Sequence, residues 1–350
     1  MGILVIIKQM LVIAILVMTG YTLFRLRIID EPMSKKLSTL VIDVCNPALA
    51  IACIIQDRPV VEHSKILFAG GIGIVIYLVL IAMGACLPAI LRIAPDERKY
   101  YHMMMVYTNT GFIGIPLARA ILPAEAMIYV IIFNVLFSLF FYTHGTYVLR
   151  SDALKRNHKN ESEAENKKVI EDQSETEDKT EKEDQSETEN KKVIAKHAIK
   201  SATKSARKIN IGIISSLIAI LLCWFNIRVP SVIGDSLIYI ANATTFLSMT
   251  VLGVSLAMVS FKDIFRGKIV YAYALLHLIV IPIIIGKAMS TIGADHSMTN
   301  AFVLMTALPG ANMPLMLAGK NGHDTRLLSQ MILLTTVLSL ITVPAVMYTL

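Results

Sequence analysis

Ten apolar runs, each bounded by charged residues, constrain the fold of this 350-residue chain more than any other feature. A helix needs about 20 apolar residues to cross a bilayer, and each run approaches that length. The hydrophobic share of 55% and the mean hydropathy of +0.62 exclude an ordinary water-soluble enzyme. The sequence therefore predicts an all-α polytopic membrane protein with ten transmembrane helices. The runs lie at about 3–24, 37–55, 66–91, 102–122, 126–149, 209–227, 236–260, 269–290, 298–319 and 327–349.

A charged segment at 150–208 separates the fifth run from the sixth. It is rich in Glu, Lys, Ser, Asn and Thr, and the blocks ENKKVI and EDQSETE each occur twice in it. Such a segment has too few apolar side chains to bury a core, so it is expected to be disordered. The sequence thus predicts three parts: a first five-helix repeat at 1–149, the linker at 150–208, and a second five-helix repeat at 209–350.

Basic residues are distributed unevenly between alternate loops. With ten spans, 27 of the 33 Lys and Arg residues fall on one side, which the positive-inside rule makes cytoplasmic. We therefore expect a multi-pass protein of the plasma (inner) membrane, with both termini outside and the linker cytoplasmic. The basic residues lie in short loops between apolar runs, which membrane orientation explains better than a nucleic-acid partner does. Membrane lipid, and no nucleic acid, is therefore an expected partner. The four cysteines lack CxxC spacing, so neither a disulfide framework nor a metal site is indicated.

The two halves resemble each other at three places. FRLRI at 24–28 matches FNIRV at 225–229, KILFA at 65–69 matches KIVYA at 268–272, and GIPLA at 114–118 aligns with NMPLM at 312–316. The matches keep their order at offsets of 201, 203 and 198 residues. Since each half has an odd number of spans, the second copy enters the membrane inverted. This is the plan of secondary transporters, which bind substrate near the midplane where the repeats meet.

Glycines, prolines and an asparagine cluster in the fourth and ninth runs, at equivalent places of the two repeats. Proline and glycine weaken a helix, and freed backbone groups are tolerated in hydrocarbon only where they face protein or a watery cavity. We therefore expect two broken helices around a shared cavity, with electropositive helix N-termini that favour an anion such as a carboxylate. The alternative is a simple kink in each helix. The candidate residues are Asn109, Gly111, Gly114, Pro116, Pro309, Gly310, Asn312 and Pro314.

Asn109 and Asn312 are the side chains expected to donate to the carboxylate, together with the backbone groups of Gly111 and Gly310. A carboxamide can donate without the desolvation cost of a buried cation. Either asparagine can instead bond to a neighbouring helix.

Asp43 is the one carboxylate inside an apolar run, and intramembrane acids are functional candidates by default. With Asn46 as its neighbour it is a weak candidate for carrying a coupling proton or sodium ion. A structural ion pair near Lys35 and Lys36 is the alternative.

His144 and His277 lie inside the fifth and eighth runs, where each either relays protons or serves as a hydrogen-bonding core residue. Catalytic signatures such as HExxH, GxSxG, a Walker loop or GxGxxG are absent from the sequence. The prediction is therefore that the chain is not an enzyme and uses no cofactor or metal.

At these residues the sequence resembles the auxin efflux carrier family, which includes bacterial malate and malonate permeases and plant PIN-type exporters. The likeness is carried by the stretches TGYTLFRLRIIDEPMSKKLSTLVIDVCNPAL, NTGFIGIPL, ALPGANMPLMLAG and TTVLSLITVP. It implies two inverted five-helix repeats, with fourth and ninth helices broken at prolines and crossing beside a bound carboxylate. Pro116 and Pro314 match the crossing prolines, and Asn109 matches the fourth-helix asparagine. Ala50 replaces a polar residue of the plant exporters, which favours a small carboxylate over an indole acid.

Taken together, the sequence predicts a secondary active transporter of small organic anions, malate-like mono- or dicarboxylates, working by alternating access. The coupling ion, proton or sodium, and the oligomeric state, including a homodimer, stay open. Two alternatives remain: a sodium-coupled bile-acid-type symporter, and a membrane sensor or scaffold that transports nothing.

Overall fold

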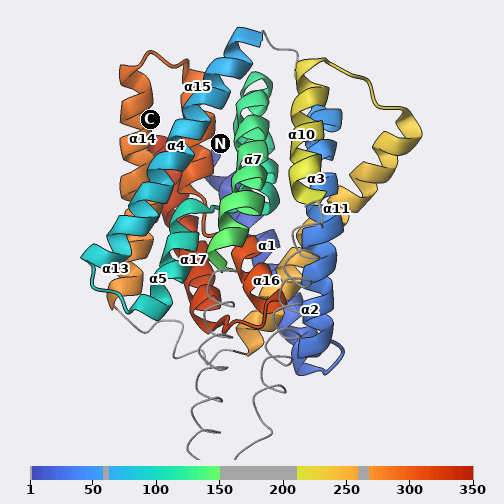
Figure 1. The fold of residues 1–350 in the computed structure, drawn as a ribbon, viewed down its shortest axis with the longest axis vertical. Coiled ribbons are helices and arrows are strands. Elements are labelled where there is room, and N and C mark those ends of the chain that lie inside the picture. The colour runs from blue at the N-terminus through green and yellow to red at the C-terminus, as the bar shows by residue number, and fades with distance from the viewer. Residues whose placement is uncertain (1, 58–62, 150–210, 259–267, 350) are drawn as a thin grey trace, which may run out of the picture. The chain divides into compact units, whose positions relative to one another are not determined.

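The computed structural model describes residues 2–57, 63–149, 211–258 and 268–349, which pack into one compact unit. The linker expected at 150–208 lies outside the described residues. Within the described ranges the chain is helical, and its extended backbone is limited to short connections and a single β-bridge. Figure 1 shows these helices, with α4, α13 and α14 toward one side and α3, α10 and α11 toward the other.

The first half contains α-helices that continue into wider π-helical turns, labelled η. Its elements are α1 (Gly2–Arg25), α2 (Glu31–Leu40), η1 (Val41–Cys45), α3 (Asn46–Asp57), α4 (His63–Ile90), α5 (Pro95–Val106), η2 (Thr110–Gly114), α6 (Ile115–Ile121), the 3₁₀ turn η3 (Ala124–Ala126), α7 (Met127–Phe140) and η4 (Phe141–Gly145).

The second half follows a similar order. Its elements are α10 (Ile211–Trp224), α11 (Ser231–Ala257), α13 (Lys268–Leu275), the π-helical η5 (Leu276–Val280), α14 (Ile281–Thr291), α15 (His296–Ala307), α16 (Asn312–Lys320) and α17 (Arg326–Tyr348).

Seven helical stretches among the described residues are long and apolar enough to cross a membrane. The other three expected spans are built from shorter pieces: α10 has 14 residues, and the runs at 102–122 and 298–319 are each divided into two helical parts. The polytopic all-α architecture is therefore confirmed, whereas the count of ten spans and the inverted repeats stay predictions.

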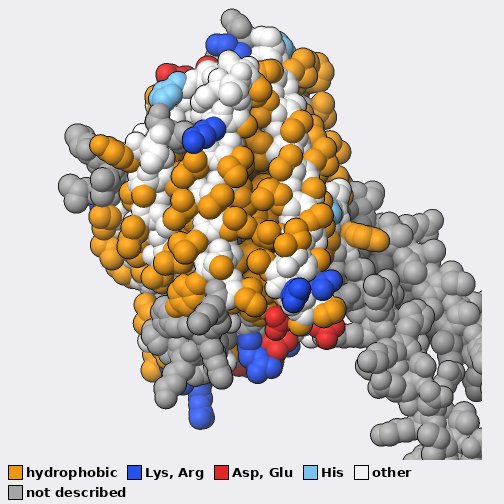
Figure 2. Space-filling view, turned by 90° about the vertical axis from the view of Figure 1, so that its left-hand side faces the viewer, with side chains coloured by type: hydrophobic (Ala, Val, Ile, Leu, Met, Phe, Trp, Pro, Cys, Tyr) orange, Lys and Arg blue, Asp and Glu red, His pale blue; other side chains and the backbone are white. Residues whose placement is uncertain are grey.

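The surface has the composition that a bilayer requires. In Figure 2 hydrophobic side chains cover most of the visible face, and charged side chains gather toward its two ends. Large apolar side chains point outward on the helices of this belt, including Leu67, Val75 and Leu78 of α4. Contiguous exposed apolar surface of this extent is not found on soluble monomers, and lipid is its natural solvent.

Aromatic packing in the core fixes the position of α15 against the first half. The ring of Phe133 on α7 lies 5.0 Å from Tyr77 of α4 and 5.2 Å from Phe302 of α15, measured between centroids. All three side chains are buried. Such offset and edge contacts are favoured between aromatic rings. They bring the ninth expected span against the third and fifth.

Candidate functional site

Among the described residues, the helical conformation is interrupted inside two of the expected spans, one in each half. The first interruption comprises Tyr107 to Asn109, between α5 and η2. The second comprises Leu308 to Ala311, between α15 and α16. The two interruptions therefore fall inside the runs at 102–122 and 298–319, close to the glycine, proline and asparagine clusters.

Pro309 explains where α15 ends. A residue that precedes proline is pushed out of the helical region, and Leu308 accordingly has φ −68° and ψ 154°. Pro314 stands third in α16, where a backbone N–H would have no intrahelical partner. Its ring would clash with the carbonyl of Gly310 if the helix extended backward. The two prolines therefore separate α15 from α16, although Pro314 itself lies in helix.

Pro116 does not break the fourth run, which corrects the expectation that the matched prolines set both interruptions. It occupies the first turn of α6 and follows the π-helical η2 without a gap. The helix stops at Tyr107, with φ −111° and ψ 100°, well before this proline. It resumes after Asn109, whose Oδ1 accepts the N–H of Phe112 at 3.3 Å. Asparagine is a favoured N-cap for this reason.

The two interruptions are joined to each other through their backbones. The N–H of Asn109 donates to the carbonyl oxygen of Pro309 at 2.8 Å, and the N–H of Ala311 donates to that of Tyr107 at 2.9 Å. Thr108 and Gly310 thereby form an antiparallel β-bridge. In hydrocarbon every backbone group must find a partner inside the protein, and here each interruption supplies partners to the other.

Two threonine hydroxyls, one from the first interruption and one from another helix, add to this pairing. The Thr108 hydroxyl donates to the carbonyl of Met305 at 2.8 Å. The hydroxyl of Thr335 on α17 accepts the N–H of Gly310 at 3.2 Å.

His277 of η5 lies beside the same interruption. Its Nε2 lies 3.2 Å from the carbonyl oxygen of Leu308, to which the ring donates, while its buried Nδ1 finds no partner within the described part of the chain. His277 is thus a hydrogen-bonding core residue in this structure, as one of the two sequence interpretations held.

The two candidate asparagines are in different situations. Asn109 uses its side-chain oxygen as a helix cap. Asn312, the first residue of α16, is 0% exposed. Its Nδ2 donates to Ser248 Oγ at 3.0 Å and contacts Met249 Sδ at 3.9 Å, and its Oδ1 has no partner among the described residues. A hydroxyl both donates and accepts, so a half-turn of the carboxamide keeps the bond to Ser248 and turns the NH₂ group to the unpartnered side. Asn312 can therefore donate to a ligand.

The start of α16 adds a second electropositive feature. Its N-cap residue, Ala311, has no capping side chain. The corresponding helix start in the first half is capped by Asn109. Uncapped N–H groups and the helix dipole favour negative charge, so the beginning of α16 is the half-helix end better suited to an anion.

The candidate glycines permit close packing of the two interrupted segments. A Cβ on Gly114 would lie 2.6 Å from Leu308 Cδ1, and one on Gly310 would lie 2.6 Å from Met104 Sδ. A Cβ on Gly111 would lie 3.2 Å from Leu49 Cδ2. These glycines therefore face packed side chains in this structure.

The cavity that lies against the pairing has a volume of only about 10 Å³, roughly one water molecule. It lies between α5, α13, η5 and α17 and is lined in part by Tyr273, His277 and Thr335. The expected shared cavity is therefore too small here for a carboxylate.

A larger and more polar cavity of about 110 Å³ lies between α2, α11 and α16. Ser34, Ser38 and Ser255 are among its lining residues. It also reaches Val251 and Leu315, which follow Ser248 and Asn312 by three residues each. The lining therefore comes within one helical turn of Ser248 on α11 and of Asn312 on α16, neither of which lines the cavity itself.

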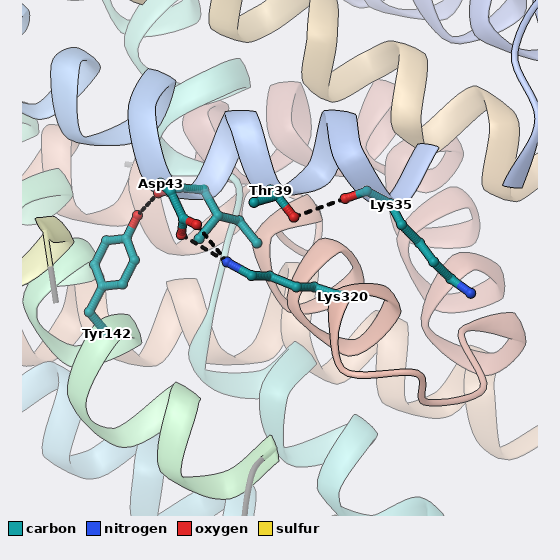
Figure 3. A network of polar contacts seen from close by, with 6 residues as sticks. Lys35, Thr39, Asp43, Tyr142 and Lys320 are labelled. Carbon is teal, nitrogen blue, oxygen red and sulfur yellow. Dashed lines mark hydrogen bonds and ion pairs between the residues drawn. The ribbon is translucent and has the colours of Figure 1, made fainter. Parts of the chain in front are cut away.

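Asp43 and Asn46 bond to different partners and do not contribute to one site. Lys320, the last residue of α16, donates to both carboxylate oxygens of Asp43, at 2.9 and 2.7 Å (Figure 3). Asn46 is buried and donates to the Tyr142 hydroxyl at 3.3 Å, and that hydroxyl donates to the carbonyl of Ile42 at 2.6 Å. Asp43 thus has an ion-pair partner from the second half, whereas the sequence suggested nearby lysines.

Sequence reasoning missed three polar residues of this region: Thr108, Ser248 and Thr335. A hydroxyl in an apolar helix most often bonds its own helix, as Thr306 does with Phe302, so residue type alone did not distinguish them. A usable signal existed for Thr108, which stands in the TNT triplet directly before the first glycine.

Interrupted helices joined at buried backbone, inside a helical unit with an apolar belt, define a polytopic membrane transporter. The sequence matches the model of the membrane transport protein family over residues 5–347, and the chain belongs to this family of auxin efflux and PIN-type carriers. It matches none of the curated proteins with which it was compared.

Proposed function

We propose that the chain is a secondary active transporter of small organic anions, mono- or dicarboxylates of the malate type. The observation that carries the proposal is Asn312, fully buried at the uncapped start of α16, with one end of its carboxamide unpartnered. A carboxylate placed there would accept from Asn312 and from the free N–H groups of the helix start. Charge-assisted bonds of this kind are stronger than neutral ones.

In this proposal the fold consists of two inverted five-helix repeats with ten spans. Reciprocal contacts support it: α1 packs on α11, and α10 packs on α3, so the first span of each repeat contacts the second span of the other. The contacts of α4 with α5 and of α14 with α15 correspond in the same way.

Alternating access would then move the paired interruptions relative to α1, α2, α3, α10 and α11. The small cavity at the pairing and the larger one between α2, α11 and α16 fit an occluded state with a closed entrance. The Asp43–Lys320 ion pair spans this boundary, because it joins η1 to the end of α16. A carboxylate already bonded to lysine is a poor sodium ligand, which weakens the bile-acid-type alternative.

The proposed orientation keeps both termini outside and the linker cytoplasmic, in the plasma (inner) membrane. The labels of the two termini lie in the upper half of Figure 1, and α2 and α16, which adjoin the basic loops 25–36 and 320–326, lie in its lower part.

Uptake of radiolabelled malate by proteoliposomes tests the proposal. Asn312→Ala should raise the half-saturating concentration about 10- to 100-fold, since a hydrogen bond to a charged group contributes about 1.5–3 kcal/mol. The matched control is Asn242→Ala, which removes an exposed carboxamide from α11. Absence of saturable uptake for malate and for a panel of related carboxylates, with a correctly folded protein, would refute the proposal. An unchanged half-saturation in Asn312→Ala would remove this residue from the site.

A further inference from the structure

A chain of titratable side chains leads away from the first interruption. The Tyr107 hydroxyl lies 2.9 Å from His144 Nδ1 and 2.9 Å from the carbonyl oxygen of Phe140. The Nε2 atoms of His144 and His102 lie 3.2 Å apart. Tyr107 belongs to the interruption itself, since its own carbonyl accepts the N–H of Ala311. The two imidazoles are therefore connected to the proposed substrate site by hydrogen bonds.

The far end of the chain is a carbonyl group on α4. His102 makes a hydrogen bond to the backbone of Gly84, and a Cβ on that glycine would lie 3.0 Å from His102 Nδ1. The carbonyl of Gly84 is available because the residue four positions later is Pro88, inside α4, which has no N–H to donate. The carbonyl of Gly84 can therefore accept from His102, whereas in a helix without this proline it would accept the N–H of the residue four positions later.

Counting hydrogens shows that this series of hydrogen bonds can accept one additional proton. Four contacts connect Phe140, Tyr107, His144, His102 and Gly84, and each needs one hydrogen. A tyrosine hydroxyl and two neutral imidazoles supply only three, so one contact always lacks a hydrogen.

One added proton completes the set. Tyr107 then donates to Phe140, His144 Nδ1–H donates to Tyr107, one hydrogen lies between the two Nε2 atoms, and His102 Nδ1–H donates to Gly84.

A second proton would not fit. With both imidazoles charged, two N–H donors would point at each other across 3.2 Å, and two cations would have ring centroids 5.0 Å apart. The pair can therefore hold a single positive charge.

The surroundings leave this charge without a permanent counter-ion. Within the described residues, neither imidazole makes a hydrogen bond or ion pair with a carboxylate, lysine or arginine. The titratable groups on neighbouring elements are neutral: Tyr77 of α4, Tyr142 of η4, Tyr273 of α13 and His277 of η5. A carboxylate at the start of α16 would supply a negative charge on the side of the interruption to which Tyr107 connects the imidazoles.

We propose that one proton bound within the chain of His102, His144 and Tyr107 is the coupling ion of transport. The inference rests on the proposed function, because the counter-charge is the transported carboxylate. A protonated pair attracts the carboxylate, and by thermodynamic reciprocity the carboxylate raises the affinity for the proton by the same factor. His144 is half-buried and His102 is 8% exposed, so His144 is the more accessible of the two imidazoles.

Proteoliposomes containing a pH-sensitive dye test the coupling, with a malate gradient as the driving force. The wild type should move protons together with malate. His144→Gln and His102→Gln should abolish most of the proton flux that accompanies malate, because a glutamine carboxamide takes up no proton in this pH range. Malate exchange should persist in both variants. His296→Gln, an exposed histidine at the start of α15, is the matched control and should keep the wild-type ratio.

A second measurement does not depend on transport. In ¹⁵N-histidine NMR spectra of the protein in nanodiscs, the signals of His102 and His144 should titrate together and take up one proton between them. Two independent titrations, or no titration between about pH 4 and 8, would overturn the inference. So would malate transport whose proton flux is unchanged in both variants. If the shared titration is seen but no carboxylate crosses, the proposed function fails and the proton site remains.

Discussion

The ammonium group of Lys320 and the carboxylate of Asp43 form a two-fold hydrogen-bonded ion pair, at 2.9 and 2.7 Å, between residues 277 positions apart. The lysine ends α16, the half-helix that begins at Asn312, and the aspartate lies in η1. The pair therefore connects the element that carries the candidate site to the helices it would have to move against.

Replacing Lys320 with Met should loosen this connection at little cost in stability. Both side chains are partly exposed, at 31% and 43%, so the free energy of unfolding should fall by only about 0–1 kcal/mol. The cavity between α2, α11 and α16 should open more often. Maleimide should therefore label Ser34→Cys faster in a cysteine-free background.

Arg326→Met, which alters an exposed pair with Asp324, provides the control. The exchange Asp43→Lys with Lys320→Asp should restore the slow labelling. The same rate of maleimide labelling in all of these variants would contradict the role assigned to the pair.

Gly114→Ala should destabilise the protein by about 1–3 kcal/mol, the usual cost of overpacking. The new Cβ would lie 2.6 Å from Leu308 Cδ1 and 2.8 Å from Met305 Sδ, so the two interrupted segments would have to separate. Gly71→Ala on α4 is the control, because nothing lies within 4 Å of its Cβ position. Thermal unfolding in detergent compares the two variants, and equal midpoints would show that the packing is looser than described.

Thr335→Val should cost about 1–3 kcal/mol because it leaves the buried N–H of Gly310 without an acceptor. Thr336→Val provides a neighbouring comparison, since its hydroxyl bonds only Ile332 within the same helix. Denaturation of both variants measures the difference. A loss in Thr335→Val no larger than in Thr336→Val would mean that the Gly310 bond adds nothing to stability.

Gly253→Ala should impair assembly of α1 with α11 more severely than any glycine change at the interruptions. Its Cβ would lie 2.0 Å from the carbonyl oxygen of Val17, and backbone cannot yield as a side chain does. We expect a marked loss of folded protein, measured as the monodisperse fraction after detergent extraction. Gly70→Ala, with open space around its Cβ position, should extract normally.

Local features of the sequence predicted the interruptions well. Pro309 restricts the residue before it, and Asn109 supplies a helix cap, and both effects act within a few residues. Pro116 misled because the wider π-helical turn η2 precedes it without a gap, so the helix continues through this proline and its presence says little about where a break lies.

Partners distant in sequence could not be predicted from it. One sequence interpretation placed Asp43 in an ion pair with Lys35 or Lys36, which precede it on the same helical run. In the structure Lys35 pairs with Glu31 at 2.7 Å, and Asp43 pairs with Lys320. His144 was recognised as a buried histidine, but its neighbours Tyr107 and His102 come from a different span. Spacing along one helix cannot reveal contacts that depend on how two helices pack.

The bridge between Thr108 and Gly310 is made of peptide groups, which every residue except proline carries in full. Systematic replacement of side chains will therefore leave its two hydrogen bonds in place and under-report their importance. Replacing the amide at Ala311 with an ester would remove the N–H that donates to Tyr107 and so measure the contribution of this bond, which side-chain mutagenesis cannot do.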